Sequence, residues 1–152
     1  MFRRTALVIF VMLVVVSIAL AACGGGGAAK PAGSESQPAA ASGNADNGKK
    51  LFNEPLIASA GAPGCVTCHS LEKGKTLVGP SLAGIATDAA NAVKEADYKG
   101  TAKTAAEWLS ESILNPNVDV PEGFKPDIMS KTFNKLSVQE LNDVVAYLQT
   151  LK

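Results

Sequence analysis

The chain has 152 residues, a length that suits one domain with appendages, and its fourteen Lys and Arg balance fourteen Asp and Glu. Proteins that bind nucleic acid normally show a clustered basic excess, so this balance argues against that class. The chain has three Cys and a single His. One imidazole excludes every metal centre that needs two His from the same chain, so the chemistry of this protein uses few reactive side chains.

Residues 1–22 have the pattern of an export signal. Eighteen of these 22 residues are apolar, and the apolar run follows Arg3 and Arg4. Cys23 directly follows Leu20-Ala21-Ala22, which resembles the bacterial lipobox, in which the Cys is lipidated and becomes the new N-terminus. We therefore expect a lipid-anchored protein on the extracytoplasmic face of a bacterial membrane, on its periplasmic or cell-surface side. An ordinary signal with an incidental Cys and an uncleaved anchor remain alternatives.

Residues 23–45 predict a flexible spacer behind the lipidated Cys. Gly, Ala, Ser and Pro occupy 18 of the 22 positions from 24 to 45. Such a segment buries too little apolar surface to offset the entropy of ordering it. The rest of the chain, residues 46–152, is then one domain with eleven Lys against thirteen Asp and Glu. Without its leader, the exported chain is slightly acidic.

The first half of this domain predicts one short helix. It begins at Asp46, which can cap it, carries Leu51 and Phe52, and ends near Pro55. The stretch from Pro55 to Gly64 then leads to Cys65-Val66-Thr67-Cys68-His69, the C-x-x-C-H haem-attachment signature. Two thiols three residues apart lie on one side of a helical turn, where they can form thioethers with the two vinyl groups of one haem and so produce haem c. The adjacent His69 can then reach the iron from the same face.

Three other interpretations of this motif are weaker. A C-x-x-C disulfide redox site would need a βαβ context, which the sequence lacks. A structural zinc site needs four ligands, and the domain has only the two Cys and the His as strong candidates. A plain disulfide between Cys65 and Cys68 would not explain the His that follows them.

Capping boxes open two more helices in the second half of the domain. Thr104-Ala105-Ala106-Glu107 begins a helix that ends before Pro116, and Ser137-Val138-Gln139-Glu140 begins the last one. Apolar residues recur in the last helix at the spacing of an amphipathic helix, with Leu136 placed as a hydrophobic staple. They are Leu141, Val144, Val145 and Leu148. No segment alternates as a β-strand does, so we expect an all-α fold whose long loops leave the centre for another group to fill.

Met129 is the only Met of the mature chain, since Met1 and Met12 lie in the leader. It falls in a loop between the last two predicted helices, where a Met could also simply fill a gap in the core. His and Met together form a standard pair of axial ligands in cytochromes c. With His69 sixty residues upstream and no second His, Met129 is the expected second ligand of the iron.

The domain resembles the class I c-type cytochromes over residues 46–152. The resemblance rests on Asn47 to Phe52, the C-x-x-C-H, Gly79 to Gly84, Met129, and Leu136 to Leu151. It implies the small cytochrome c fold, in which Gly48 and Phe52 meet the stretch from Val145 to Leu148. It also implies that the Pro80 carbonyl accepts a hydrogen bond from His69 and that Trp108 lines the haem near Met129, although a plain core aromatic would fit Trp108 equally well. Two features depart from the family pattern: a longer stretch from Pro55 to Gly64, and Ser130 where Pro is common.

A haem iron with both axial positions filled carries single electrons and has no open site for a substrate. We therefore expect an electron carrier of a respiratory or photosynthetic chain, not an enzyme. Its partners would be redox proteins such as a quinol-oxidising complex, an oxidase or a reaction centre. One alternative is a fixed subunit of a larger membrane complex, such as an alternative quinol-oxidising complex. A haem peroxidase that displaces Met129 ranks last, because the sequence shows no distal His and no general acid–base pair.

Overall fold

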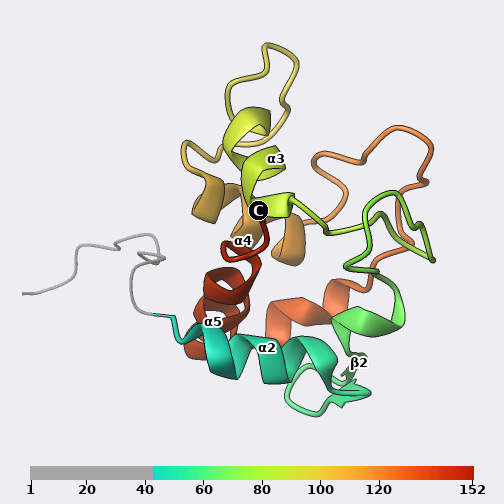
Figure 1. The fold of residues 1–152 in the computed structure, drawn as a ribbon, viewed down its shortest axis with the longest axis vertical. Helices are drawn as coiled ribbons and strands as arrows, with labels where there is room; N and C mark the ends of the chain where they lie inside the picture. The colour runs from blue at the N-terminus through green and yellow to red at the C-terminus, as the bar shows by residue number, and fades with distance from the viewer. Residues whose placement is uncertain (1–42) are drawn as a thin grey trace, which may run out of the picture. The chain divides into compact units, whose positions relative to one another are not determined.

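The computed structural model describes residues 43–152 (Figure 1). The predicted leader, Cys23 and nearly all of the spacer lie outside the described residues. None of the helices within 43–152 is long and apolar enough to cross a membrane. The described chain begins with the helix α2, and two short strands and five further helical elements follow it. In order, the elements are α2 (Ala45–Asn53), β1 (Leu56–Ile57), β2 (Ala62–Pro63), the 3₁₀ turn η2 (Cys65–Thr67), α3 (Ile85–Ala92), α4 (Ala105–Leu114), the 3₁₀ turn η3 (Lys131–Lys135) and α5 (Val138–Leu148).

The first and last described helices, α2 and α5, pack against each other (Figure 1). Gly48 lies where they touch, and a Cβ there would overlap the carbonyl oxygen of Asp143. The missing side chain therefore lets the two backbones approach. Phe52 is fully buried, and its ring meets that of Tyr147 edge to face with centroids 5.4 Å apart. The crossing that the family resemblance implied is present in the fold.

The cap of α2 differs from the prediction. The side chain of Asn44, not that of Asp46, accepts hydrogen bonds from the first free backbone N–H groups, those of Asp46 and Asn47. Asp46 instead sits in the first turn, where its charge favours the helix dipole. The backbone N–H of Asn44 donates to the buried carboxylate of Asp143 on α5 at 2.7 Å. A contact across 99 residues thus sets where this helix begins.

The stretch from Pro55 to Gly64 forms a small antiparallel hairpin. Leu56 pairs with Pro63 and Ile57 with Ala62, and Gly61 takes the left-handed conformation in the turn. This is a small departure from the expected all-α fold. Ile57, Ala60 and Ala62 are all about 1 % exposed, so the longer segment contributes to the core.

Both predicted capping boxes are present. The side chain of Thr104 accepts from the backbone N–H of Glu107 at the start of α4, and Glu107 accepts in return from Thr104. Ser137 and Glu140 make the same reciprocal pair at the start of α5. These motifs are local, since all their donors and acceptors lie within four residues, and so the sequence identifies them directly.

The helix α3 was not predicted. It follows Gly84, whose φ of 82° is left-handed, and no side chain caps its first turn. Without a Ser, Thr, Asp or Asn at the cap, the usual start signal is missing. Its Ala-rich composition was the signal available. Ile85 and Ala89 are buried in the core that α4 and α5 share.

Two loops are longer than the others in the part of the chain that the structure describes. One joins η2 to α3 (green in Figure 1) and the other joins α4 to η3 (orange). Both loops lie on the right-hand side of Figure 1. The first carries Pro80 and the second carries Met129. The helices therefore form a base from which both loops reach toward one region of the molecule.

Candidate haem-binding site

Cys65, Cys68 and His69 are held on one tight turn. The backbone N–H groups of Cys68 and His69 both donate to the carbonyl of Cys65, at 3.1 and 2.9 Å. Cys65 and Cys68 are free thiols in this structure, with no disulfide between them. Burial raises the pKa of the Cys65 thiol to about 11. The polypeptide therefore presents this thiol in its protonated form at neutral pH.

His69 makes the hydrogen bond that the resemblance implied. Its Nδ1 lies 2.9 Å from the carbonyl oxygen of Pro80. A carbonyl can only accept, so the proton is on Nδ1 and the lone pair is left on Nε2. Burial lowers the pKa of His69 below its ordinary value, and the bond to Pro80 offsets this only in part. The ring is therefore neutral at neutral pH, which is the form that binds a metal.

Gly79 holds the ring of His69 from one side. A Cβ on this buried glycine would lie 2.5 Å from Cε1, 2.9 Å from Nδ1 and 3.0 Å from Nε2 of the imidazole. No side chain fits in that space, so the backbone of residue 79 packs directly on the ring. The sequence showed a Gly next to Pro80 as part of a family mark, but its contact with His69 appears only in the tertiary structure.

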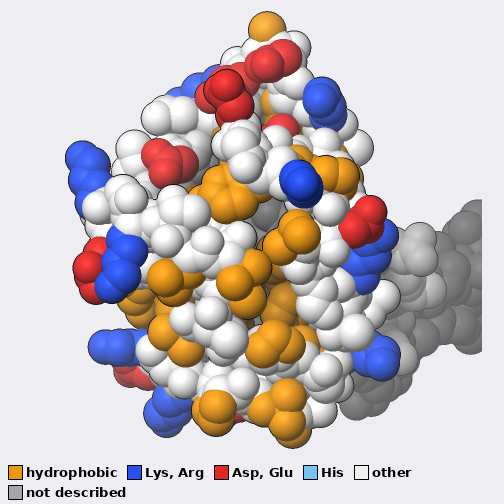
Figure 2. All heavy atoms as spheres, turned by 90° about the vertical axis from the view of Figure 1, so that its right-hand side faces the viewer, with side chains coloured by type: hydrophobic (Ala, Val, Ile, Leu, Met, Phe, Trp, Pro, Cys, Tyr) orange, Lys and Arg blue, Asp and Glu red, His pale blue; other side chains and the backbone are white. Residues whose placement is uncertain are grey.

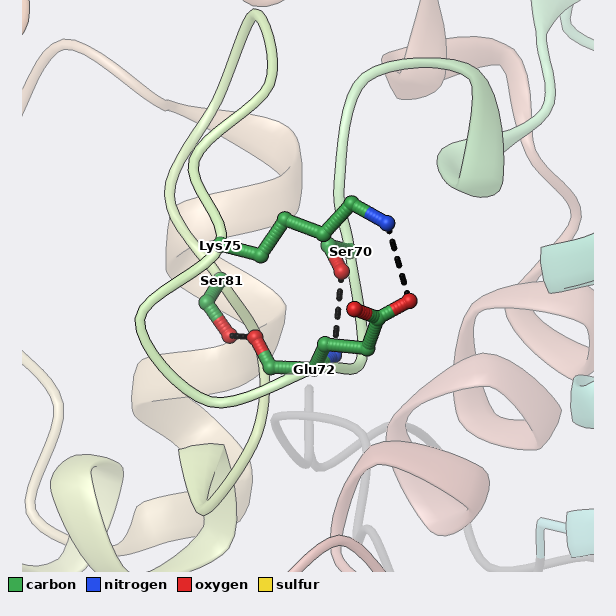
Figure 3. A network of polar contacts seen from close by, with 4 residues as sticks. All are labelled: Ser70, Glu72, Lys75 and Ser81. Atoms are coloured by element: carbon green, nitrogen blue, oxygen red, sulfur yellow. Dashed lines mark hydrogen bonds and ion pairs between the residues drawn. The ribbon is translucent and has the colours of Figure 1, made fainter.

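The loop that carries Pro80 is braced by its own polar groups (Figure 3). The Ser70 hydroxyl accepts from the backbone N–H of Glu72 at 2.9 Å, and the Ser81 hydroxyl donates to the Glu72 carbonyl at 2.7 Å. Lys75 pairs with the Glu72 carboxylate at 2.9 Å. In addition, Gly79 donates from its backbone to the Cys68 carbonyl at 2.8 Å. These bonds fix the residues on both sides of Pro80, so its carbonyl faces His69 in a set position.

Met129 comes from the opposite long loop. Its side chain is partly buried and packs against the core, whereas the preceding Ile128 is 55 % exposed. Ser130 follows and caps η3, since its hydroxyl accepts from the backbone N–H of Thr132 at 3.3 Å. The Ser that departs from the family pattern thus has a structural role at the start of this turn.

Trp108 projects from α4 with a donor that lacks an acceptor. Its Nε1 is the one buried side-chain nitrogen or oxygen, among the described residues, without a hydrogen-bond partner. A buried N–H without a partner is costly, and native structures rarely keep one. Haem carries propionate groups, which are acceptors. The orphaned N–H therefore fits a site that is completed by a bound group.

The face that carries both loops is apolar in its middle. In Figure 2 hydrophobic side chains gather around a narrow hollow there, while Lys, Asp and Glu lie mostly toward the periphery. A large apolar ring system with a polar group on one edge suits such a lining. The thiol pair, the neutral His69 and the Trp108 donor fit the same group. The residues present therefore fit haem c.

The zinc interpretation gains nothing from the structure. Within residues 43–152 no three side chains of His, Cys, Asp or Glu come together in a way that could hold a metal ion. A zinc site built on the motif would require a fourth ligand beside Cys65, Cys68 and His69.

Comparisons with known proteins agree with the site. The family profile described as Cytochrome c matches residues 45–152. The chain is 30 % identical to a cytochrome c of Euglena viridis over 72 % of its own length and 99 % of the relative's. It is 29 % identical to a cytochrome c2 of Rhodopseudomonas palustris strain ATCC BAA-98 / CGA009, over 80 % of its own length and 90 % of the relative's. No solved structure gave a significant match. The chain belongs to the cytochrome c family and carries one covalently attached haem c.

Proposed function

We propose that this protein is a membrane-anchored monohaem cytochrome c that passes single electrons along a respiratory or photosynthetic chain. Electron transfer is the function of its family. The observation that best supports haem binding by His69 is the hydrogen bond from its Nδ1 to the Pro80 carbonyl, which leaves Nε2 free for the iron. Cys65 and Cys68 supply the two thioethers, and His69 and Met129 are the two axial ligands.

The chain supplies the surroundings that set the redox behaviour. When bound, haem supplies an iron that gains or loses one electron. The carbonyl of Pro80 makes His69 more basic, because it draws on the Nδ1 proton. The neutral thioether of Met129 favours the ferrous state and raises the reduction potential. The apolar lining acts in the same direction, since the ferric form carries the extra charge.

Cys23 would hold the protein at the membrane through its lipid, and the spacer from 24 to 45 would let the domain move. This arrangement suits a carrier that passes between a quinol-oxidising complex and an oxidase or a reaction centre. The partner would approach the haem edge near the thioethers. Lys73 and Lys75 lie on the loop after the motif, but Lys75 is paired with Glu72, so this loop offers only a weak positive field.

A Met129→Ala variant tests the ligation. We expect the ferric protein to lose its sulfur-to-iron charge-transfer band and the reduction potential to fall, because the thioether is gone. Ile128→Ala is the matched control, since it truncates the exposed neighbour and should leave both readouts unchanged. If the band and the high potential survive in Met129→Ala, then Met129 is not the ligand.

Purification from native membranes in mild detergent separates the carrier from the fixed subunit of a larger complex. A carrier comes away alone, whereas a subunit migrates with its partners. Carbon monoxide tests the peroxidase alternative in the same preparation. Ferrous protein with both axial positions filled does not bind carbon monoxide. An iron with an open axial position would bind it at once.

A further inference from the structure

Asn117 and Asp127 hold each other across the loop between α4 and η3. The Asn117 side chain donates from Nδ2 to the Asp127 carboxylate at 2.8 Å, and its Oδ1 accepts from the Asp127 backbone N–H at 2.9 Å. One amide thus binds both the side chain and the backbone of Asp127. This two-point contact, which we call the Asn117–Asp127 clamp, closes the base of a loop whose ends are ten positions apart.

Asp127 turns the chain just before Met129. Its φ of 64° is left-handed, and no other non-glycine residue from 43 to 152 has a positive φ. Asp tolerates this conformation better than most residues, but it still needs support from its surroundings. After this turn Ile128 faces solvent and Met129 packs against the core. The backbone direction at Asp127 therefore decides which of the two side chains enters the interior.

Met129 is held from both sides along the chain. The clamp fixes Asp127, two residues before it, and the Ser130 cap of η3 fixes the residue after it. Asp127 also pairs with Lys131 at 2.6 Å, but both side chains are about two-thirds exposed. An ion pair that is so exposed to water contributes little to stability. The clamp differs because one of its bonds holds the backbone N–H of Asp127, so it restrains the backbone of this residue directly.

We propose that Asn117, acting through Asp127, is a positioning residue that keeps the Met129 sulfur directed at the haem iron. The inference rests on the proposed ligation by Met129. Without the Asn117 amide, Asp127 loses the support for its left-handed backbone, and Met129 leaves the iron more often. An added ligand then competes more successfully for the same position.

The test uses the purified holoprotein in its ferric form. Imidazole is titrated as the competing ligand, and its Kd, the charge-transfer band and the reduction potential are measured. Asn117→Ala removes both clamp bonds, and we expect imidazole to bind about tenfold more tightly, with a weaker band and a lower potential. Asp127→Asn keeps an acceptor oxygen and tolerates the left-handed backbone, so its Kd should stay within about twofold of wild type.

Two further variants act as controls. Asn91→Ala removes an exposed amide from α3, and Lys131→Gln breaks the exposed ion pair, so neither should change the Kd. An equal Kd in Asn117→Ala and Asn91→Ala, with the wild-type band present, would overturn the positioning role and leave the proposed function standing. A wild-type ferric protein without the band would overturn both.

Discussion

The two sides of the haem site are held in different ways. On the His69 side, the ring is partly buried, is packed against Gly79 and is hydrogen-bonded to Pro80 within a loop that braces itself. On the Met129 side, no hydrogen bond holds the side chain, and the loop is closed by an exposed contact between Asn117 and Asp127. The first side is fixed by buried packing, whereas on the second side a partly buried Met129 is carried by a loop that surface polar contacts close.

This difference predicts which of the two axial ligands is released first when the fold weakens. Displacing His69 requires breaking a buried contact and repacking the loop around it, which costs several interactions at once. Moving Met129 requires the opening of a surface loop and the loss of partly buried packing, but it breaks no hydrogen bond of the side chain. We therefore expect conditions that weaken the fold to release Met129 while His69 is still in place.

The largest expected effect comes from removing both thiols on the His69 side. The double variant Cys65→Ala/Cys68→Ala cannot form thioethers, so we expect a chain without covalent haem, as measured by mass and by haem staining in a denaturing gel. Cys23→Ser is the matched control, because it removes the one Cys outside the motif and should keep its haem. Covalent haem in the double variant would refute the assignment of these two Cys.

An intermediate effect is expected from Gly79→Ala. The new Cβ would overlap the His69 ring, and overpacking of this kind lowers the free energy of unfolding by about 1–3 kcal/mol. Urea unfolding measures it, and a shifted reduction potential should accompany the displaced ring. Gly74→Asn is the control, since a Cβ there meets nothing within 4 Å and Asn accepts the left-handed backbone. If the two variants are equally stable, the His69 side is less tightly packed than proposed.

The smallest effect concerns the loop between α3 and α4, which packs on α4. The hydroxyl of Tyr98 donates to the Glu111 carboxylate on α4, and Glu111 also accepts from the Thr101 backbone at 3.0 Å. Burial and this carboxylate raise the pKa of Tyr98 from 10.0 to about 12. Because the folded state favours the neutral hydroxyl, its contribution to stability is complete below pH 10 and is lost as the pH rises toward 12.

Glu111→Gln removes the charge beside this hydroxyl. We expect the pKa of Tyr98 to move down toward its ordinary value, as followed by tyrosinate absorbance, with no change in the charge-transfer band. Glu54→Gln changes an exposed carboxylate at the end of α2 and should leave the titration as it is. A charge-transfer band that weakens in Glu111→Gln would mean that the support for Met129 reaches further than the clamp.

Much of the molecule followed from the sequence alone because its signals are local. The C-x-x-C-H motif predicted the haem, and the two capping boxes predicted the starts of α4 and α5, since each needs only residues within a few positions. The spacing of Leu141, Val144, Val145 and Leu148 predicted the buried face of α5, and all four are buried. The predicted leader and the anchor at Cys23 lie outside the described residues and stay predictions.

The tertiary structure decided what depends on distant partners. Asn44 became the cap of α2 because α5 brings the Asp143 carboxylate to its backbone, and α3 formed behind a glycine without a side-chain cap. Gly79 meets the His69 ring, and Asn117 meets Asp127, only once the loops are folded. The residue types that carry the chemistry were therefore readable in the sequence. Their fixed positions were not, because these come from contacts between segments that only packing brings together.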